Sequence, residues 1–128
     1  MVSTWTAHSL VVTSDDGNVC EGATRIGATT KDVEWRITTE DPAILLEVDM
    51  VNHPVDHMRY AGTSSGLDFT GSYATGSEYL DFFCEVRGGR LTGYFSADHS
   101  RFDATETLIW GPPSEERTLT RRWTGLKR

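Results

Sequence analysis

The sequence predicts an all-β domain in which one antiparallel meander closes into a small β-barrel, with a two-sheet β-sandwich as the alternative. Apolar and polar residues alternate over most of the chain, which is the pattern of strands buried on one face. Clusters of Gly, Asp, Asn and Pro separate these segments at short intervals, as turns do. About eight to ten such segments follow one another, and a meander of that length must close or split into two packed sheets to hide its edges. The length of 128 residues suits a single domain, residues 1–128.

The first half of the chain predicts strands over residues 4–13, 19–26, 33–38 and 43–51. Residues 54–60 are ambiguous between two structures. A return strand with Met58 and Tyr60 pointing inward is favoured over a single helical turn that begins at Pro54. Residues 61–66, AGTSSG, are predicted as a flexible loop.

The second half predicts a strand over residues 67–73 and then two hairpins. Gly88-Gly89 is expected to form a type I′ turn inside a hairpin over residues 78–98, because both central residues of that turn need a positive φ. The register then places Phe82 opposite Phe95 on the apolar face.

A polar loop over residues 98–103 leads to the final hairpin, with strands over residues 104–110 and 116–124. With Leu108 opposite Leu119 in that hairpin, Glu106 falls opposite Arg121 as a cross-strand charge pair.

Charge and composition exclude several classes of function. The net charge of −7 disfavours a general nucleic-acid-binding protein, because affinity for phosphate comes mainly from clustered Lys and Arg. Residues 115–128 hold five basic and two acidic residues, a local charge of +3 that leaves −10 on the rest of the chain. No apolar run approaches the roughly 20 residues of a membrane helix, and the first residues, MVSTWTAHSLVV, lack the pattern of a secretion signal. We therefore expect a cytoplasmic protein that binds neither nucleic acid nor membrane.

Metal and redox motifs are weak in this sequence. The spacing of His53 and His57 would bring both imidazoles to one metal ion only on a helix, and Pro54 disfavours a regular helix there. Cys20 and Cys84 belong to no CxxC pair, so we expect buried free thiols, with a disulfide as the alternative. The sequence predicts no metal and no cofactor.

Catalytic motifs are missing as well. The sequence holds no nucleophile elbow and no phosphate-binding glycine loop. Asp98, His99 and Asp103 are the one acid–base grouping expected near a barrel mouth, and a solvated loop is the simpler reading of them. No catalytic residue is therefore predicted.

Aromatic residues at inward positions are the remaining functional signal. Such rings either fill a small barrel or line an apolar pocket at one mouth. Small inward residues, among them Gly71, Gly93 and Ala97, leave volume that favours a pocket. The predicted ligand-binding residues are Trp35, Met50, Phe69, Tyr73, Phe82, Phe95 and Trp123.

This arrangement resembles the calycin-like barrels of lipocalins and the allene-oxide-cyclase-like barrels in architecture. The G-x-W motif that opens many lipocalins is missing around Trp5. The resemblance implies a barrel that binds an apolar small molecule. If the protein is an enzyme, it would be a cofactor-independent cyclase or isomerase that folds a polyketide or polyene chain by shape complementarity. The alternative is an acidic interaction module, such as an inhibitor or immunity-type protein without catalytic activity. A homodimer through Phe83 and Tyr94 on the outer face is a further expectation.

Overall fold

The computed structural model of the chain describes residues 1–14, 26–29, 32–49, 57–73, 80–81, 84–110 and 117–128. These residues form strands and turns, with no helix among them and so none that is long and apolar enough to cross a membrane. The strands, in chain order, are β1 (Val2–Ser14), β2 (Val33–Glu40), β3 (Ala43–Asp49), β4 (His57–Ser65), β5 (Asp68–Tyr73), β6 (Leu80–Asp81), β7 (Cys84–Phe95), β8 (Arg101–Trp110) and β9 (Arg117–Lys127).

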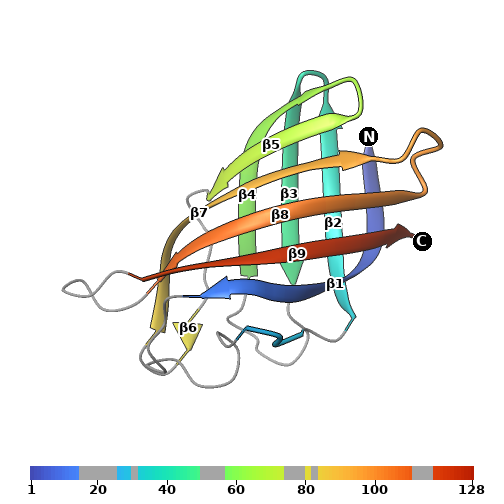
Figure 1. Ribbon diagram of the computed structural model, residues 1–128. Helices are drawn as coiled ribbons and strands as arrows, with labels where there is room; N and C mark the ends of the chain where they lie inside the picture. The colour runs from blue at the N-terminus through green and yellow to red at the C-terminus, as the bar shows by residue number, and fades with distance from the viewer. Residues whose placement is uncertain (15–25, 30–31, 50–56, 74–79, 82–83, 111–116) are drawn as a thin grey trace.

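The strands close into an antiparallel barrel, as the sequence predicts (Figure 1). Along the sheet the order is β5-β4-β3-β2-β1-β9-β8-β7, and pairing of β5 with β7 joins the two ends. The short β6 lies against the start of β7 and takes no part in the closure. Because its two edge strands pair with each other, the meander hides its edges by closure and not by the two packed sheets of a sandwich.

The barrel has two walls that cross at a steep angle. Figure 1 shows β2, β3 and β4 side by side in one wall, with β7, β8 and β9 crossing in front of them. β1 belongs to both walls, because it pairs with β2 and with β9, and its register shifts between Val11 and Thr13. A bulge of this kind increases the bend and twist of a strand.

Gly88 and Gly89 do not form the predicted hairpin turn. β7 runs through both glycines and pairs with β8 along this stretch, after a register shift that follows Val86. Neither glycine has the positive φ that a type I′ turn requires. Packing explains Gly89, since a Cβ atom at this position would lie 2.9 Å from the hydroxyl oxygen of Tyr60. A glycine pair permits a bulge and a close contact as well as a turn.

The register predicted around Phe95 is also wrong. Phe95 pairs with Phe102 of β8 and not with Phe82, which lies outside the described residues. The polar loop predicted over residues 98–103 ends earlier, because β8 begins at Arg101 and the Phe102 side chain is fully buried.

β4 settles the ambiguous segment in favour of a return strand. Met58 and Tyr60 are both fully buried, as that alternative requires. The loop predicted over residues 61–66 is wrong, since β4 continues to Ser65. Gly62 made this stretch look like a loop, but a Cβ atom there would lie 1.8 Å from the carbonyl oxygen of Thr70. Glycine is needed here because β4 and β5 approach each other closely.

The remaining strands agree with the sequence pattern. In the final hairpin Leu108 pairs with Leu119 and Glu106 with Arg121, which confirms the predicted register. The strand predicted over residues 19–26 falls almost entirely outside the described residues.

Candidate functional site

Six buried aromatic side chains fill one part of the barrel interior, and we call them the aromatic cluster: Trp5, Trp35, Phe69, Phe95, Phe102 and Trp123. Neighbouring rings lie 4.9–6.5 Å apart between centroids, in tilted or edge-to-face geometry. Four of the predicted ligand-binding residues are brought together here, namely Trp35, Phe69, Phe95 and Trp123. Phe102, which the sequence assigned to a loop, lies at the centre of the cluster.

Glycines give these rings their space. A Cβ atom on Gly125 would lie 2.0 Å from the Phe102 ring, and a Cβ atom on Gly93 would lie 2.6 Å from the Phe69 ring. Small inward residues were expected to leave space for a ligand. At Gly93 this space is filled by the protein's own Phe69 ring. Ala97, another of those small residues, is exposed. The aromatic cluster fills its part of the interior.

The other predicted ligand-binding residues lie elsewhere. Tyr73 is half-buried and packs edge-to-face against Tyr60, with 6.1 Å between ring centroids. Met50 and Phe82 lie outside the described residues, as does Cys20.

In the predicted acid–base grouping beside the barrel mouth, Asp98 stabilises a turn. The Asp98 carboxylate accepts hydrogen bonds from the Ser96 and Ser100 hydroxyls, at 2.7 Å each, and from the Ser100 amide. These bonds, those of Ser100 and Ser96 first, lower the pKa of Asp98 to about 2. Asp103 instead pairs with Arg101, at 3.0 Å.

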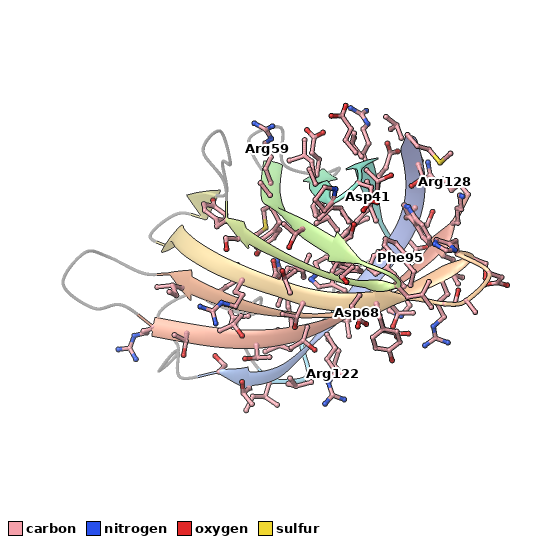
Figure 2. The ribbon with its side chains drawn as sticks, turned by 90° about the horizontal axis from the view of Figure 1, so that it is seen from above. Asp41, Arg59, Asp68, Phe95, Arg122 and Arg128 are labelled. Carbon is pink, nitrogen blue, oxygen red and sulfur yellow. The ribbon has the colours of Figure 1, made fainter. Side chains whose placement is uncertain are left out.

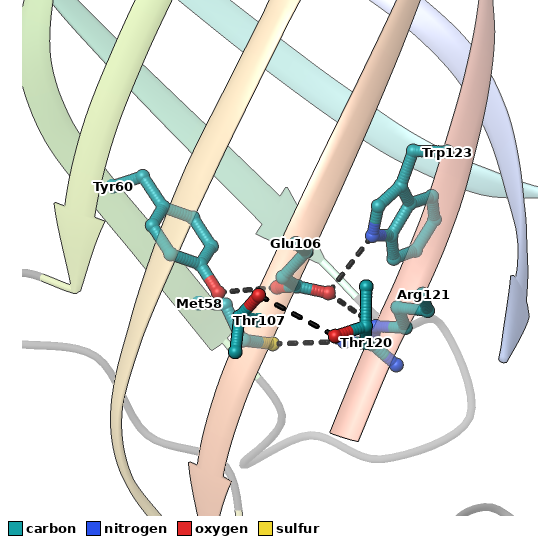
Figure 3. Close-up of polar contacts among 7 residues, drawn as sticks. All are labelled: Met58, Tyr60, Glu106, Thr107, Thr120, Arg121 and Trp123. Atoms are coloured by element: carbon teal, nitrogen blue, oxygen red, sulfur yellow. Dashed lines mark hydrogen bonds and ion pairs between the residues drawn. The ribbon is translucent and has the colours of Figure 1, made fainter. Parts of the chain in front are cut away.

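A polar network crosses the interior next to the aromatic cluster, and we call it the Glu106 network (Figure 3). The Glu106 carboxylate accepts hydrogen bonds from the Tyr60 hydroxyl, from Arg121 Nε and, at 2.9 Å, from Trp123 Nε1. Arg121 Nη2 also lies 3.5 Å from the Met58 sulfur. These residues come from three strands, with Met58 and Tyr60 on β4, Glu106 on β8, and the remaining two on β9.

The Glu106 network is buried as deeply as the core. Glu106 is 1% exposed and Arg121 is 5% exposed, and they form an ion pair. Burial raises the pKa of Tyr60 well above its usual 10.0, and the negative charge of Glu106 raises it further. Tyr60 is therefore a neutral hydrogen-bond donor at physiological pH, facing a carboxylate inside the barrel.

Trp123 belongs to both groups. Its ring packs edge-to-face on Trp35 at 5.0 Å, its N–H binds Glu106, and the Arg121 guanidinium carbon lies 5.0 Å from its ring centroid. In contrast, the buried N–H of Trp35 has no hydrogen-bond acceptor among the described residues.

The sequence holds more information about this network than the predicted pairing uses. The prediction that Glu106 and Arg121 are neighbours across two strands is correct. Period two also places Glu106 on the same face as Leu108, and Arg121 on the same face as Leu119, which are core residues. The pair therefore had to point inward. The contribution of Tyr60 depends on the closure of β5 on β7, which no local pattern reveals.

The arrangement combines hydrogen-bond donors with an acid–base group inside the barrel. It offers one carboxylate, one guanidinium, one tyrosine hydroxyl and one indole N–H. No group of three or more metal-ligating side chains occurs among the described residues.

No protein-family model matches the chain, and a search of curated proteins finds no significant sequence match.

Proposed function

We propose that this barrel binds a mainly apolar small molecule that carries a carbonyl or hydroxyl oxygen, in the part of its interior beside the Glu106 network. The observation that carries the proposal is the buried Glu106–Arg121 ion pair with the Tyr60 hydroxyl against it. The proposed binding site is therefore the Glu106 network, and not the rings of the aromatic cluster that the sequence predicted.

A purely structural role explains this network poorly. Replacing a buried ion pair by apolar residues of similar volume is often neutral or stabilises a protein by about 1–4 kcal/mol, because desolvation of two charges offsets their attraction. A barrel that needed only stability would therefore keep leucines at positions 106 and 121, as it does at positions 108 and 119. A residue whose pKa is strongly shifted by burial and by a specific charged partner, as that of Tyr60 is, is a candidate for a functional role.

The surroundings of the network suit a ligand with an apolar body. Leu91 pairs with Glu106, and the Leu108–Leu119 pair is the next inward pair along the same hairpin. All three leucines are buried. A ligand oxygen would accept a hydrogen bond from the Arg121 guanidinium, or from the Tyr60 hydroxyl once its single proton turns from Glu106 to the ligand.

If the protein is an enzyme, the reaction most compatible with these residues is a cofactor-independent cyclisation or isomerisation. The barrel would hold a flexible polyene or polyketide in a folded conformation, so that its reacting atoms are near each other. Tyr60 would polarise a ligand carbonyl, and Glu106 would accept and return a proton. The ligand itself supplies every atom of the product, so no other reactant is needed.

A thermal-shift screen followed by calorimetric titration tests this proposal. The probes are β-ionone, a polyene ketone, farnesol, an isoprenoid alcohol, and naringenin, a phenolic polyketide. A ligand at 100 times its Kd stabilises the folded state by about 2.7 kcal/mol, so binding raises the Tm measurably.

We expect at least one probe to bind and Tyr60→Phe to weaken that binding. Tyr94→Phe, which removes the hydroxyl of an exposed tyrosine, is the matched control and should leave binding unchanged. If no probe raises the Tm, the interior does not take up this class of ligand and the proposal is wrong.

A further inference from the structure

A hollow lies on the outside of the barrel, apart from the Glu106 network. It has a volume of about 690 Å³ and lies over β5, β7, β8 and β9. Side chains of Phe69, Ala104 and Trp123 point into the core beneath it, so the hollow is separated from the interior by the backbone of the sheet. Sheets in small barrels coil strongly, which makes their outer surface concave along one direction.

Two rows of side chains cross the four strands in register and line this hollow. One row is Asp68, Tyr94, Asp103 and Thr124, and the other is Thr70, Thr92, Thr105 and Arg122. At the usual spacing of neighbouring strands each row is about 14 Å long. Figure 2 shows Arg122 directed away from the barrel on the outer side of this wall.

The hollow offers hydrogen-bonding groups to solvent. Thr70, Thr92 and Thr105 are exposed, and none of their hydroxyls is hydrogen-bonded to another described side chain. Short threonine side chains in the middle of the rows, with the longer Arg122 and Tyr94 beside them, make the surface hollow. Each hydroxyl both donates and accepts, so the row matches a ligand that presents hydroxyls in turn.

Tyr94 adds an apolar face to these polar groups. Tyr94 is 55% exposed, and its strand neighbours in the row are Asp68 and Asp103. An exposed ring beside carboxylates and hydroxyls can pack against the C–H face of a sugar ring while the polar groups bind its hydroxyls.

The charges favour a neutral ligand. Asp103 is partly neutralised by its ion pair with Arg101, and Arg122 stands opposite the remaining acidic residue, Asp68, across the hollow. An anionic ligand would meet two carboxylates, and a cationic ligand would meet Arg122. From this geometry we infer that the outer hollow binds a short neutral oligosaccharide across β5, β7, β8 and β9.

NMR titration of the whole protein tests the inference, with cellotriose, maltotriose and N,N′,N″-triacetylchitotriose as separate probes. We expect at least one trisaccharide to shift the amide signals of β5, β7, β8 and β9 in a saturable way. Tyr94→Ala should weaken that binding about tenfold, as expected for the loss of a ring contact. Thr105→Val keeps the shape of the side chain and removes its hydroxyl, so it should also weaken binding.

Thr63→Val is the matched control, because Thr63 is an exposed threonine on β4 outside the hollow. All the replaced side chains are exposed, so the variants should fold, which an unchanged Tm would verify. Saturable shifts in the four strands that Tyr94→Ala weakens and Thr63→Val does not would support the inference. The absence of shifts with all three sugars up to about 10 mM, or shifts that persist unchanged in both hollow variants, would overturn it.

Discussion

The two parts of the barrel interior, the aromatic cluster and the Glu106 network, are filled by different kinds of side chain. The aromatic cluster fills its volume with rings, and glycines on facing strands, such as Gly125 under Phe102, provide the space. The Glu106 network fills the neighbouring volume with an ion pair, a tyrosine hydroxyl and an indole N–H. The first arrangement maximises buried apolar area, whereas the second buries charge at the expense of stability.

This difference shows where the function of the barrel should be sought. Aromatic content alone pointed to the cluster, yet ring-to-ring packing leaves those side chains engaged with one another. The Glu106 network holds groups that can recognise an oxygen atom, and Trp123 joins it to the cluster. The polar part of the interior is therefore the better candidate site.

The largest expected effect comes from breaking the ion pair. Glu106→Leu removes the partner of Arg121 and leaves a buried guanidinium unpaired, so we expect the free energy of unfolding to fall by about 3–5 kcal/mol. Replacing both residues, Glu106→Leu with Arg121→Met, should restore only part of this loss: no charge then remains buried, but the Tyr60 hydroxyl and the Trp123 N–H still lose their acceptor. Urea denaturation measures both. If Glu106→Leu alone were as stable as the parent protein, the buried ion pair would be contradicted.

Overpacking the aromatic cluster should have the next largest effect. In Gly93→Ala the new Cβ would lie 2.5 Å from the Asp103 carbonyl oxygen and 2.6 Å from the Phe69 ring, so we expect a loss of about 1–3 kcal/mol. Gly88→Ala on the same strand is the control, because its new Cβ would lie no closer than 3.8 Å to the Ile109 side chain. Equal stability of the two variants in urea would show that the cluster is not tightly packed around Gly93.

The dependence of the free energy of unfolding on pH above 10 tests the environment of Tyr60. Its pKa in the folded state is raised above 10.0, so above that pH the unfolded chain has lost a proton that the folded state still holds. Stability is therefore fully present below pH 10 and should fall above it, by up to about 1.4 kcal/mol per pH unit from this one group.

Tyr60→Phe should remove this part of the fall, and Tyr94→Phe should not, when urea midpoints are compared between pH 8 and pH 11. Parallel curves for the parent protein and Tyr60→Phe would contradict the raised pKa.

The smallest effect concerns two tryptophans of the aromatic cluster. Trp5 Nε1 donates to the Ser3 hydroxyl at 2.8 Å, whereas the Trp35 N–H has no acceptor among the described residues. Trp5→Phe breaks a hydrogen bond that Trp35→Phe does not. We therefore expect Trp5→Phe to be the more destabilising of the two, by about 1 kcal/mol. The reverse order in thermal denaturation would show that Trp35 has a hydrogen-bond acceptor in solution.

The fold was predictable because period two survives in most strands, and β2 with Val33, Trp35 and Ile37 inward is a clear example. Most of the errors came from glycine. Gly62 and Gly88-Gly89 look like loop and turn residues, but they lie inside strands, and at Gly62 and Gly89 a neighbouring backbone or side chain comes close. Glycine permits both situations, and only the three-dimensional neighbours decide between them.

The candidate site was predictable in part for a similar reason. The pairing of Glu106 with Arg121 is local to one hairpin, so turn length and register revealed it. The contact of Glu106 with Tyr60 joins β4 to β8 and exists only in the closed barrel. Non-local contacts of this kind leave no trace in the spacing of residues along the chain.

The most direct test of the central claim is ligand binding by the doubly substituted protein, Glu106→Leu with Arg121→Met. If the ion pair serves recognition, this variant should still fold, as a cooperative urea transition would verify, but should lose the calorimetric binding of whichever probe the parent protein binds among β-ionone, farnesol and naringenin. Undiminished binding of that probe by the folded double variant would show that the Glu106 network has no part in ligand recognition.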